Sequence, residues 1–134
     1  MACPFFWPGE LLDSSRWARA PRYPLGAAWN GTCHANPIDV IRPEEQQMRE
    51  VCNCGYARPR CSRFPADTKG DAVRFSIISR EGDRVCMIYA YESQGAPRSH
   101  GTLNFFVDSE RFEGSDDKLL QAQARAFLWG YLAQ

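Results

Sequence analysis

The chain has 134 residues, 16 acidic and 16 basic side chains, and a hydrophobic content of 44%. This length allows one domain with a hydrophobic core and is too short for two, so we treat residues 1–134 as a single domain. A net charge of zero without a lysine or arginine run argues against nucleic-acid binding through phosphate contacts. The N-terminal residues lack the basic start and the long apolar run of a signal peptide or membrane span, which favours a cytoplasmic location.

The first 32 residues show neither the period of a strand nor that of a helix. Only Glu10 to Ala20 could hold a helix, because prolines interrupt the segment elsewhere: Pro4, Pro8, Pro21 and Pro24. We therefore expect these residues to wrap irregularly around the remainder of the chain.

A short helix is predicted from Pro43 to Val51. Proline is tolerated at the first helical position, and the two glutamates that follow it suit the positive end of the helix dipole. Asn53 and Gly55 favour a left-handed backbone just beyond this helix. The cysteine-rich region, residues 1–65, is thus expected to be irregular apart from short helices.

The second half of the chain, residues 66–134, begins with a polar turn over 66–71 and then has the pattern of a folded scaffold. Alternating side chains predict three strands, with a Gly/Pro loop before the third: 72–79, 84–92 and 102–108, and the loop over 93–101. The last segment, 116–132, carries an apolar stripe at helical spacing, and Ser115 could cap it. The expected fold class is α+β: an irregular cysteine-rich half, a three-stranded antiparallel meander and a C-terminal helix.

Six cysteines are the most informative residues of the sequence. In a reducing cytoplasm, clustered cysteines favour metal binding or redox chemistry over disulfides. Cys52, Cys54 and Cys61 fall within ten residues, and Cys3 and Cys33 also stand beside glycine or proline and near aromatic residues. We expect one metal or cluster site that gathers these scattered segments.

The other chemically reactive side chains have simpler interpretations. Cys86 lies within a predicted strand and is expected in the core. Adjacent residues of an extended segment point to opposite faces, so Cys33 is preferred to His34 as a ligand. His100 is expected on a loop, without a catalytic partner in sequence, and common catalytic motifs are absent. The sequence therefore favours a protein that is not a stand-alone enzyme.

The spacing of the cysteines bears on the identity of the metal. Structural zinc sites usually contain paired Cys-x-x-Cys motifs, which this chain lacks. Single cysteines from distant segments suit a [4Fe–4S] cluster, and proline follows Cys3 as it follows a cluster cysteine in ferredoxins. Zinc is the alternative.

Five short motifs together resemble those of a group of small bacterial cysteine-motif proteins with an iron–sulfur site. They are Cys3-Pro4-Phe5-Phe6, Pro21-Arg22-Tyr23-Pro24-Leu25-Gly26, Gly31-Thr32-Cys33-His34, Cys52-Asn53-x-Gly55-Tyr56-Ala57 and Cys61-x-Arg63-Phe64-Pro65. The resemblance covers about the first 78 residues and implies that the four ligands are Cys3, Cys33, Cys52 and Cys61. Position 54 is usually apolar in that group, so Cys54 departs from the pattern and is at most an alternate ligand. The resemblance implies no activity.

Three functions are compatible with such a site. A cluster held by four thiolates has no open position for substrate, which favours an electron carrier or accessory subunit bound to a protein partner in a larger redox assembly. The second is a zinc-stapled interaction protein without redox activity. The third is a small enzyme or redox sensor in which Cys54 is a thiol beside the cluster.

Overall fold

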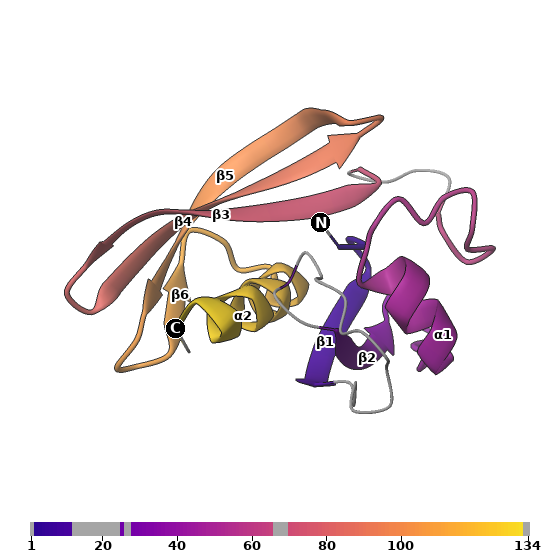
Figure 1. Cartoon of the computed structure of the whole chain (residues 1–134), viewed down its shortest axis with the longest axis horizontal. Coiled ribbons are helices and arrows are strands. Elements are labelled where there is room, and N and C mark those ends of the chain that lie inside the picture. Colours follow the sequence, from indigo (N-terminus) through magenta and orange to yellow (C-terminus); the bar gives the residue numbers. More distant parts are fainter. Residues whose placement is uncertain (1, 12–24, 26–27, 66–69, 133–134) are drawn as a thin grey trace, which may run out of the picture.

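The computed structural model describes residues 2–11, 25, 28–65 and 70–132. Its elements are mostly strands, arranged in two antiparallel sheets with two short helical segments and one longer helix (Figure 1). In chain order they are β1 (Phe6–Leu11), β2 (Trp29–Cys33), α1 (Glu45–Gln47), η1 (Met48–Cys52), β3 (Ala72–Glu81), β4 (Arg84–Ser93), β5 (Ala96–Phe106), β6 (Arg111–Glu113) and α2 (Lys118–Leu132). The predicted α+β class, with an irregular N-terminal half and a three-stranded meander, is therefore wrong.

The larger sheet has four strands in the order β3-β4-β5-β6, where three were predicted. The additional strand, β6, has only three residues, which is too short to show an alternating pattern in sequence. Its central residue, Phe112, pairs with Phe105 of β5, and their ring centroids lie 4.9 Å apart. This aromatic pair buries the apolar face of β6 against the sheet.

The predicted loop over 93–101 is also wrong, because β5 already begins at Ala96. Gln94 and Gly95 both have positive φ, 53° and 77°, as the two central residues of a tight hairpin turn require. Pro97, whose ring removes an N–H donor, is tolerated because β6 pairs with β5 only from Asn104 onwards, leaving this end of β5 at the sheet edge.

The N-terminal half contains a two-stranded sheet formed by β1 and β2, where the sequence predicted irregular backbone. Pro8 and Gly31 interrupt the strand pattern in sequence, yet they lie opposite each other in the sheet. A Cβ atom at Gly31 would lie 1.9 Å from the backbone oxygen of Trp7, so only glycine allows the two strands to approach this closely. The helix considered for Glu10 to Ala20 lies mostly outside the described residues, and its first two residues belong to β1.

The helix predicted over Pro43–Val51 is present as the short α1 followed directly by η1, a π-helical turn that ends at Cys52. Asn53 stays in the right-handed region with φ −79°, contrary to the expectation of a left-handed residue. The positive φ values fall on Gly55 and Tyr56, at 78° and 55°. The chain reverses direction at these two residues, immediately after Cys52.

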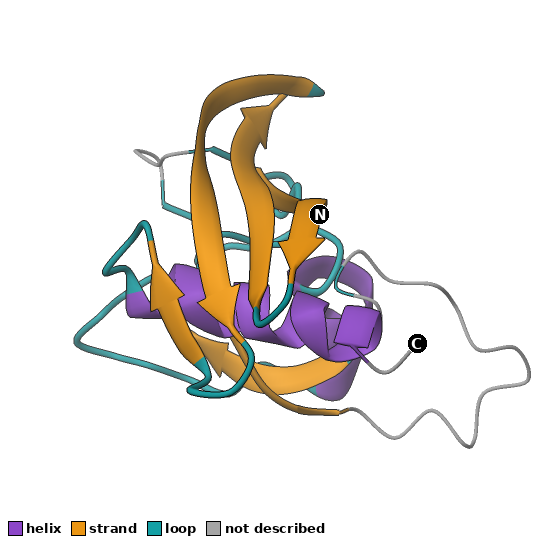
Figure 2. Cartoon of the chain, turned by 90° about the vertical axis from the view of Figure 1, so that its left-hand side faces the viewer, coloured by secondary structure: helices purple, strands orange, loops and turns teal. Residues whose placement is uncertain are grey.

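Helix α2 connects the two sheets. Figure 1 shows it below the long sheet and beside β1, and Figure 2 shows the strands of the long sheet rising over it. Phe127 stacks on Phe75 of β3 at 5.8 Å. Asp117 caps the helix by accepting hydrogen bonds from the Leu119 and Leu120 amides, in place of the predicted Ser115.

One hydrophobic core extends through both halves of the chain. The fully buried Ala2 exchanges two 2.8 Å backbone hydrogen bonds with Val73 of β3, which attaches the N-terminal segment to the long sheet. Among the described residues, no helix is long and apolar enough to cross a membrane.

Candidate functional site

Four cysteines converge from four separate segments of the N-terminal half. The Cys3 amide donates a 3.0 Å hydrogen bond to the backbone oxygen of Cys52, and Cys33 pairs in register with Phe6, three residues after Cys3. The thiols of Cys33 and Cys61 lie near enough to act electrostatically on Cys3, and all three act on Cys52. The structure therefore places the four selected cysteines in one region of the N-terminal half, and their ligation of a metal stays a prediction.

Burial divides these four thiols into two pairs. Cys3 and Cys52 are buried at 7% exposure each, whereas Cys33 and Cys61 are partly exposed. Burial raises the pKa of Cys3 to about 12, an effect opposed by the backbone amides of Phe5 and Phe6 and increased by the neighbouring thiols. Burial likewise raises the pKa of Cys52, and the other three thiols raise it further. The raised pKa values of Cys3 and Cys52 favour the protonated thiol at neutral pH.

A cavity of about 440 Å³ opens onto the partly exposed side of the four cysteines. Cys33, Cys52 and Cys61 line it, together with the charged residues Glu44, Arg60 and Arg63. Each arginine is also paired with a nearby acid, Arg60 with Glu50 at 4.0 Å and Arg63 with Asp39 at 3.6 Å. This is the side from which a metal, a sulfide ion or a redox partner could reach the thiols.

Two buried amide side chains hold the cysteine segments in place, and neither was selected from sequence. Asn53, with no exposed surface, accepts a 3.0 Å hydrogen bond from the Trp29 amide and donates to the backbone oxygens of Trp29 and Met48 at 3.0 and 2.8 Å. It thereby joins the start of β2, the strand that ends at Cys33, to η1, which ends at Cys52.

Gln123 of α2 plays the corresponding role for the Cys3 segment. Its side-chain nitrogen donates to the backbone oxygens of Cys3 and Phe6 at 2.8 and 2.7 Å, and the residue is 1% exposed. A glutamine on the apolar stripe of α2 is the only signal that could have indicated this contact in sequence.

The loop between Cys52 and Cys61 is anchored to the long sheet. The Tyr56 hydroxyl donates a 2.6 Å hydrogen bond to the buried carboxylate of Glu92, which also pairs with Arg74 at 3.3 Å. Arg58 pairs with Asp71 at 3.0 Å. These contacts hold the loop against the long sheet and the residue that precedes it.

The remaining two cysteines have surroundings that differ from those of the four thiols. Cys54 donates to the Arg49 backbone oxygen at 3.5 Å; burial raises its pKa, and the charges that act on it include Arg60 and Glu50. Cys86 faces the opposite side of β4 from the buried Val85 and Met87, so the expected core position is wrong.

The two histidines lie in different segments of the chain and have different surroundings. His34 hydrogen-bonds Thr32 at 2.9 Å and contacts the Trp7 ring, and the preference for Cys33 as a ligand stays a prediction. His100 is exposed on β5 and not on a loop as predicted.

The four cysteine thiols are chemically suited to bind an iron–sulfur cluster or a single metal ion. Four thiols are the ligands that such groups require, and the Phe5 and Phe6 amides favour a thiolate at Cys3. Within the described ranges, no three His, Cys, Asp or Glu side chains form a group that could hold a metal ion as they stand. Ligation by these thiols therefore remains a prediction.

Comparison with known proteins adds no assignment, since no family model, curated protein or solved structure matches the chain. The functional argument consequently depends on the geometry of the four cysteines and of the residues that hold them.

Proposed function

We propose that the protein binds a [4Fe–4S] cluster through Cys3, Cys33, Cys52 and Cys61 and acts as an electron carrier or an accessory subunit of a redox assembly. The observation that carries the proposal is the convergence of four thiols from four segments, two of them buried. Gathering four unmodified thiols, two buried and two partly exposed, gives little stability by itself, because a free cysteine packs only as a small apolar residue wherever it lies. A bound cationic group gives the arrangement a physical reason.

A cluster is favoured over a single ion by the arrangement of the ligands in the chain. A tetrahedral zinc ion would draw its thiolates to roughly 3.8 Å from one another, because each metal–sulfur bond is about 2.3 Å long. A four-iron cluster spreads its ligands more widely, which suits cysteines supplied singly by a loop, a strand, a π-helical turn and a second loop. Backbone amides directed at sulfur, as at Cys3, also tune the potential of such clusters.

Electron transfer follows from the ligand count and from the partial exposure of the site. With four protein thiolates, the iron would have no open position for substrate, so the group would supply one-electron chemistry. The cavity beside Cys33 and Cys61 leaves one side of the site near solvent, which a redox partner needs for close approach. Function in a reducing compartment such as the cytoplasm is part of the proposal, because there the six cysteines stay unpaired.

The first experiment measures iron, acid-labile sulfide and visible and EPR spectra of the anaerobically purified protein. We expect about four irons and four sulfides per chain in the wild type, and loss of most of both in the Cys3→Ser, Cys33→Ser, Cys52→Ser and Cys61→Ser variants. Cys86→Ser is the matched control, because Cys86 lies on β4 of the four-stranded sheet. This variant should keep the iron and sulfide content of the wild type. Cluster loss in Cys54→Ser equal to that in Cys52→Ser would contradict the ligand assignment.

The second experiment separates electron transfer from structural support. A potentiometric titration should show a reversible one-electron change in the wild-type protein. A colourless protein with one zinc per chain would instead establish the alternative, a zinc-stapled interaction protein. A redox-silent cluster, with faster amide exchange in the serine variants over residues 1–65, would indicate a structural metal.

A further inference from the structure

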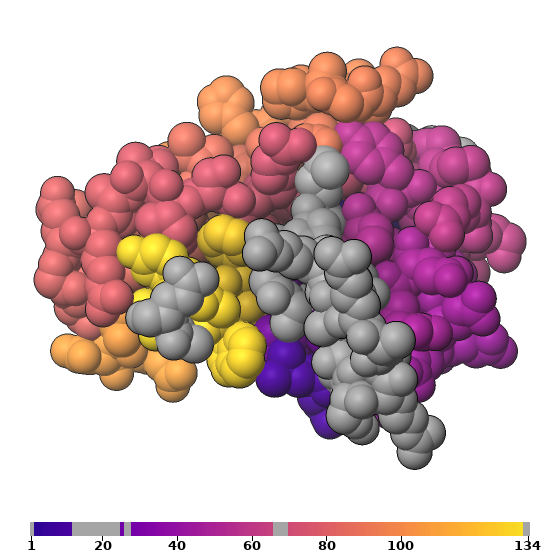
Figure 3. Space-filling model, in the orientation of Figure 1, coloured from indigo at the N-terminus to yellow at the C-terminus, as the bar shows by residue number. Residues whose placement is uncertain are grey.

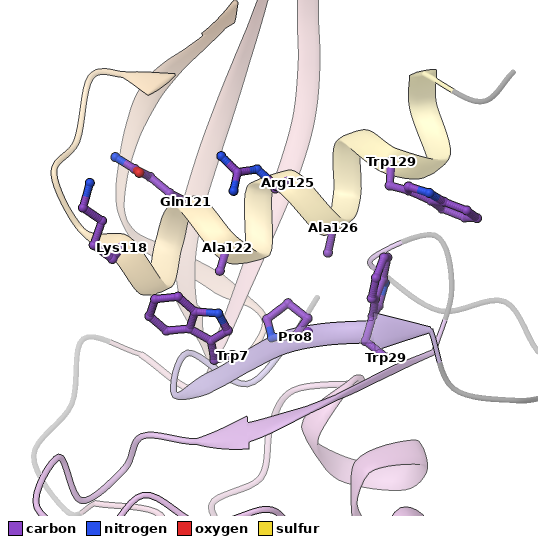
Figure 4. A pocket seen from close by; sticks show the side chains of 10 residues that line it. Trp7, Pro8, Trp29, Lys118, Gln121, Ala122, Arg125, Ala126 and Trp129 are labelled. Atoms are coloured by element: carbon purple, nitrogen blue, oxygen red, sulfur yellow. The ribbon is translucent and has the colours of Figure 1, made fainter. Parts of the chain in front are cut away.

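A second cavity lies between β1 and α2. It has a volume of about 590 Å³, within the range of pockets that hold small molecules. Figure 4 shows the side chains that line it, and Figure 3 shows the indigo surface of β1 beside the yellow surface of α2. We call this cavity the tryptophan groove.

Indole rings form much of the groove. Trp7 from β1 and Trp29 from β2 rise from the sheet toward α2, and Trp129 closes the far end from the last turns of the helix (Figure 4). The Trp29 and Trp129 rings meet edge to face at 5.9 Å, and Trp129 is 50% exposed. The small side chains Ala122 and Ala126 face these rings and leave the space between them open.

Polar and cationic side chains line the opposite rim. Lys118, Gln121 and Arg125 stand at three- and four-residue spacing on α2 and extend from one side of the helix (Figure 4). Arg125 is held in place, because it donates to the backbone oxygen of Glu110 at 3.2 Å and lies over the Phe112 ring. The described lining residues include two cations and no acid.

Trp29, which lines the groove, carries a buried N–H group without an acceptor in the part of the chain that the structure describes. The indole nitrogen of Trp29 has no hydrogen-bond partner among the described residues, although the side chain is 93% buried. A buried N–H without an acceptor is unusual and costs free energy.

We propose that the tryptophan groove binds a planar aromatic ligand that carries a phosphate or carboxylate, of the size of a mononucleotide. Aromatic rings stack on indoles, and the cations on the rim provide charge-assisted hydrogen bonds to the anionic group. The proposal is independent of the metal site, because none of the four cysteines lines this cavity.

The test is isothermal titration of the full-length protein, as purified, with four aromatic anions: AMP, GMP, UMP and flavin mononucleotide. At least one should bind with a Kd below about 1 mM, and its dephosphorylated counterpart, such as adenosine for AMP, should bind at least tenfold more weakly. Inorganic phosphate alone should give no measurable binding, because it lacks the ring.

Two variants locate the binding. Lys118→Gln combined with Arg125→Gln should raise the Kd of the anion roughly tenfold or more. Arg98 is an exposed arginine on β5, so the control variant Arg98→Gln should leave the Kd unchanged. Ala122→Trp should fill the groove and abolish binding while unfolding midpoints stay near wild type. The proposal is overturned if none of the four anions binds below about 1 mM, if the neutral counterpart binds equally well, or if the double variant binds like Arg98→Gln.

Discussion

Replacing Asn53 with alanine should strongly destabilise the protein. The change removes three hydrogen bonds and leaves the buried N–H and carbonyl of Trp29 without this partner, whereas the Met48 carbonyl keeps the backbone amide of residue 53 as a donor. Each buried polar group left unpaired costs about 1–3 kcal/mol, and partial relaxation lowers the sum. We therefore expect the free energy of unfolding to fall by about 2–5 kcal/mol, a large part of the total for a domain of this size.

Urea denaturation followed by tryptophan fluorescence measures this change. With a slope of roughly 1–2 kcal/mol/M, the midpoint should shift by at least about 1 M. Asn36→Ala is the matched control, because Asn36 is exposed and accepts one hydrogen bond from the Ile38 amide at 3.1 Å, so its effect should stay within about 0.5 kcal/mol. Equal midpoints for the two variants would refute the argument that Asn53 joins β2 to η1. Iron content should fall in Asn53→Ala as well, because the same contacts position Cys33 and Cys52.

Three further predictions test the supports of the cysteine site. Gln123→Leu removes two buried hydrogen bonds to the carbonyls of Cys3 and Phe6, of which the Cys3 carbonyl keeps the Phe6 amide as a donor, and should lower the free energy of unfolding by about 1–3 kcal/mol; an unchanged thermal midpoint would contradict it. Gly31→Ala should disrupt the β1–β2 sheet and reduce metal content, because its Cβ would collide with the Trp7 backbone, whereas Gly9→Ala, with a Cβ 3.6 Å from its nearest neighbour, should keep it. Metal affinity should rise with pH, because the raised pKa of Cys3 means that ligation must release a thiol proton; chelator competition at several pH values checks this, and a flat profile would exclude such a release.

Parts of the fold followed from local sequence patterns. The strands β3 and β4 and the helix α2 were predicted close to their observed bounds, since alternation and helical spacing act within one segment. The cysteine segments were also recognisable, because clustered thiols beside glycine and proline have few structural explanations. These features depend on residues close in sequence, which is why inspection of the sequence could find them.

Only the tertiary structure showed how the N-terminal half is built. The pairing of β1 with β2 joins residues 18 to 27 positions apart, and Pro8 and Gly31 obscure the strand pattern that would have indicated it. The roles of Asn53 and Gln123 depend on backbone groups 24 and 120 residues away, respectively, to which no local pattern points. A buried amide looks in sequence like any polar residue, and only its surroundings in the folded chain make it a support of the site.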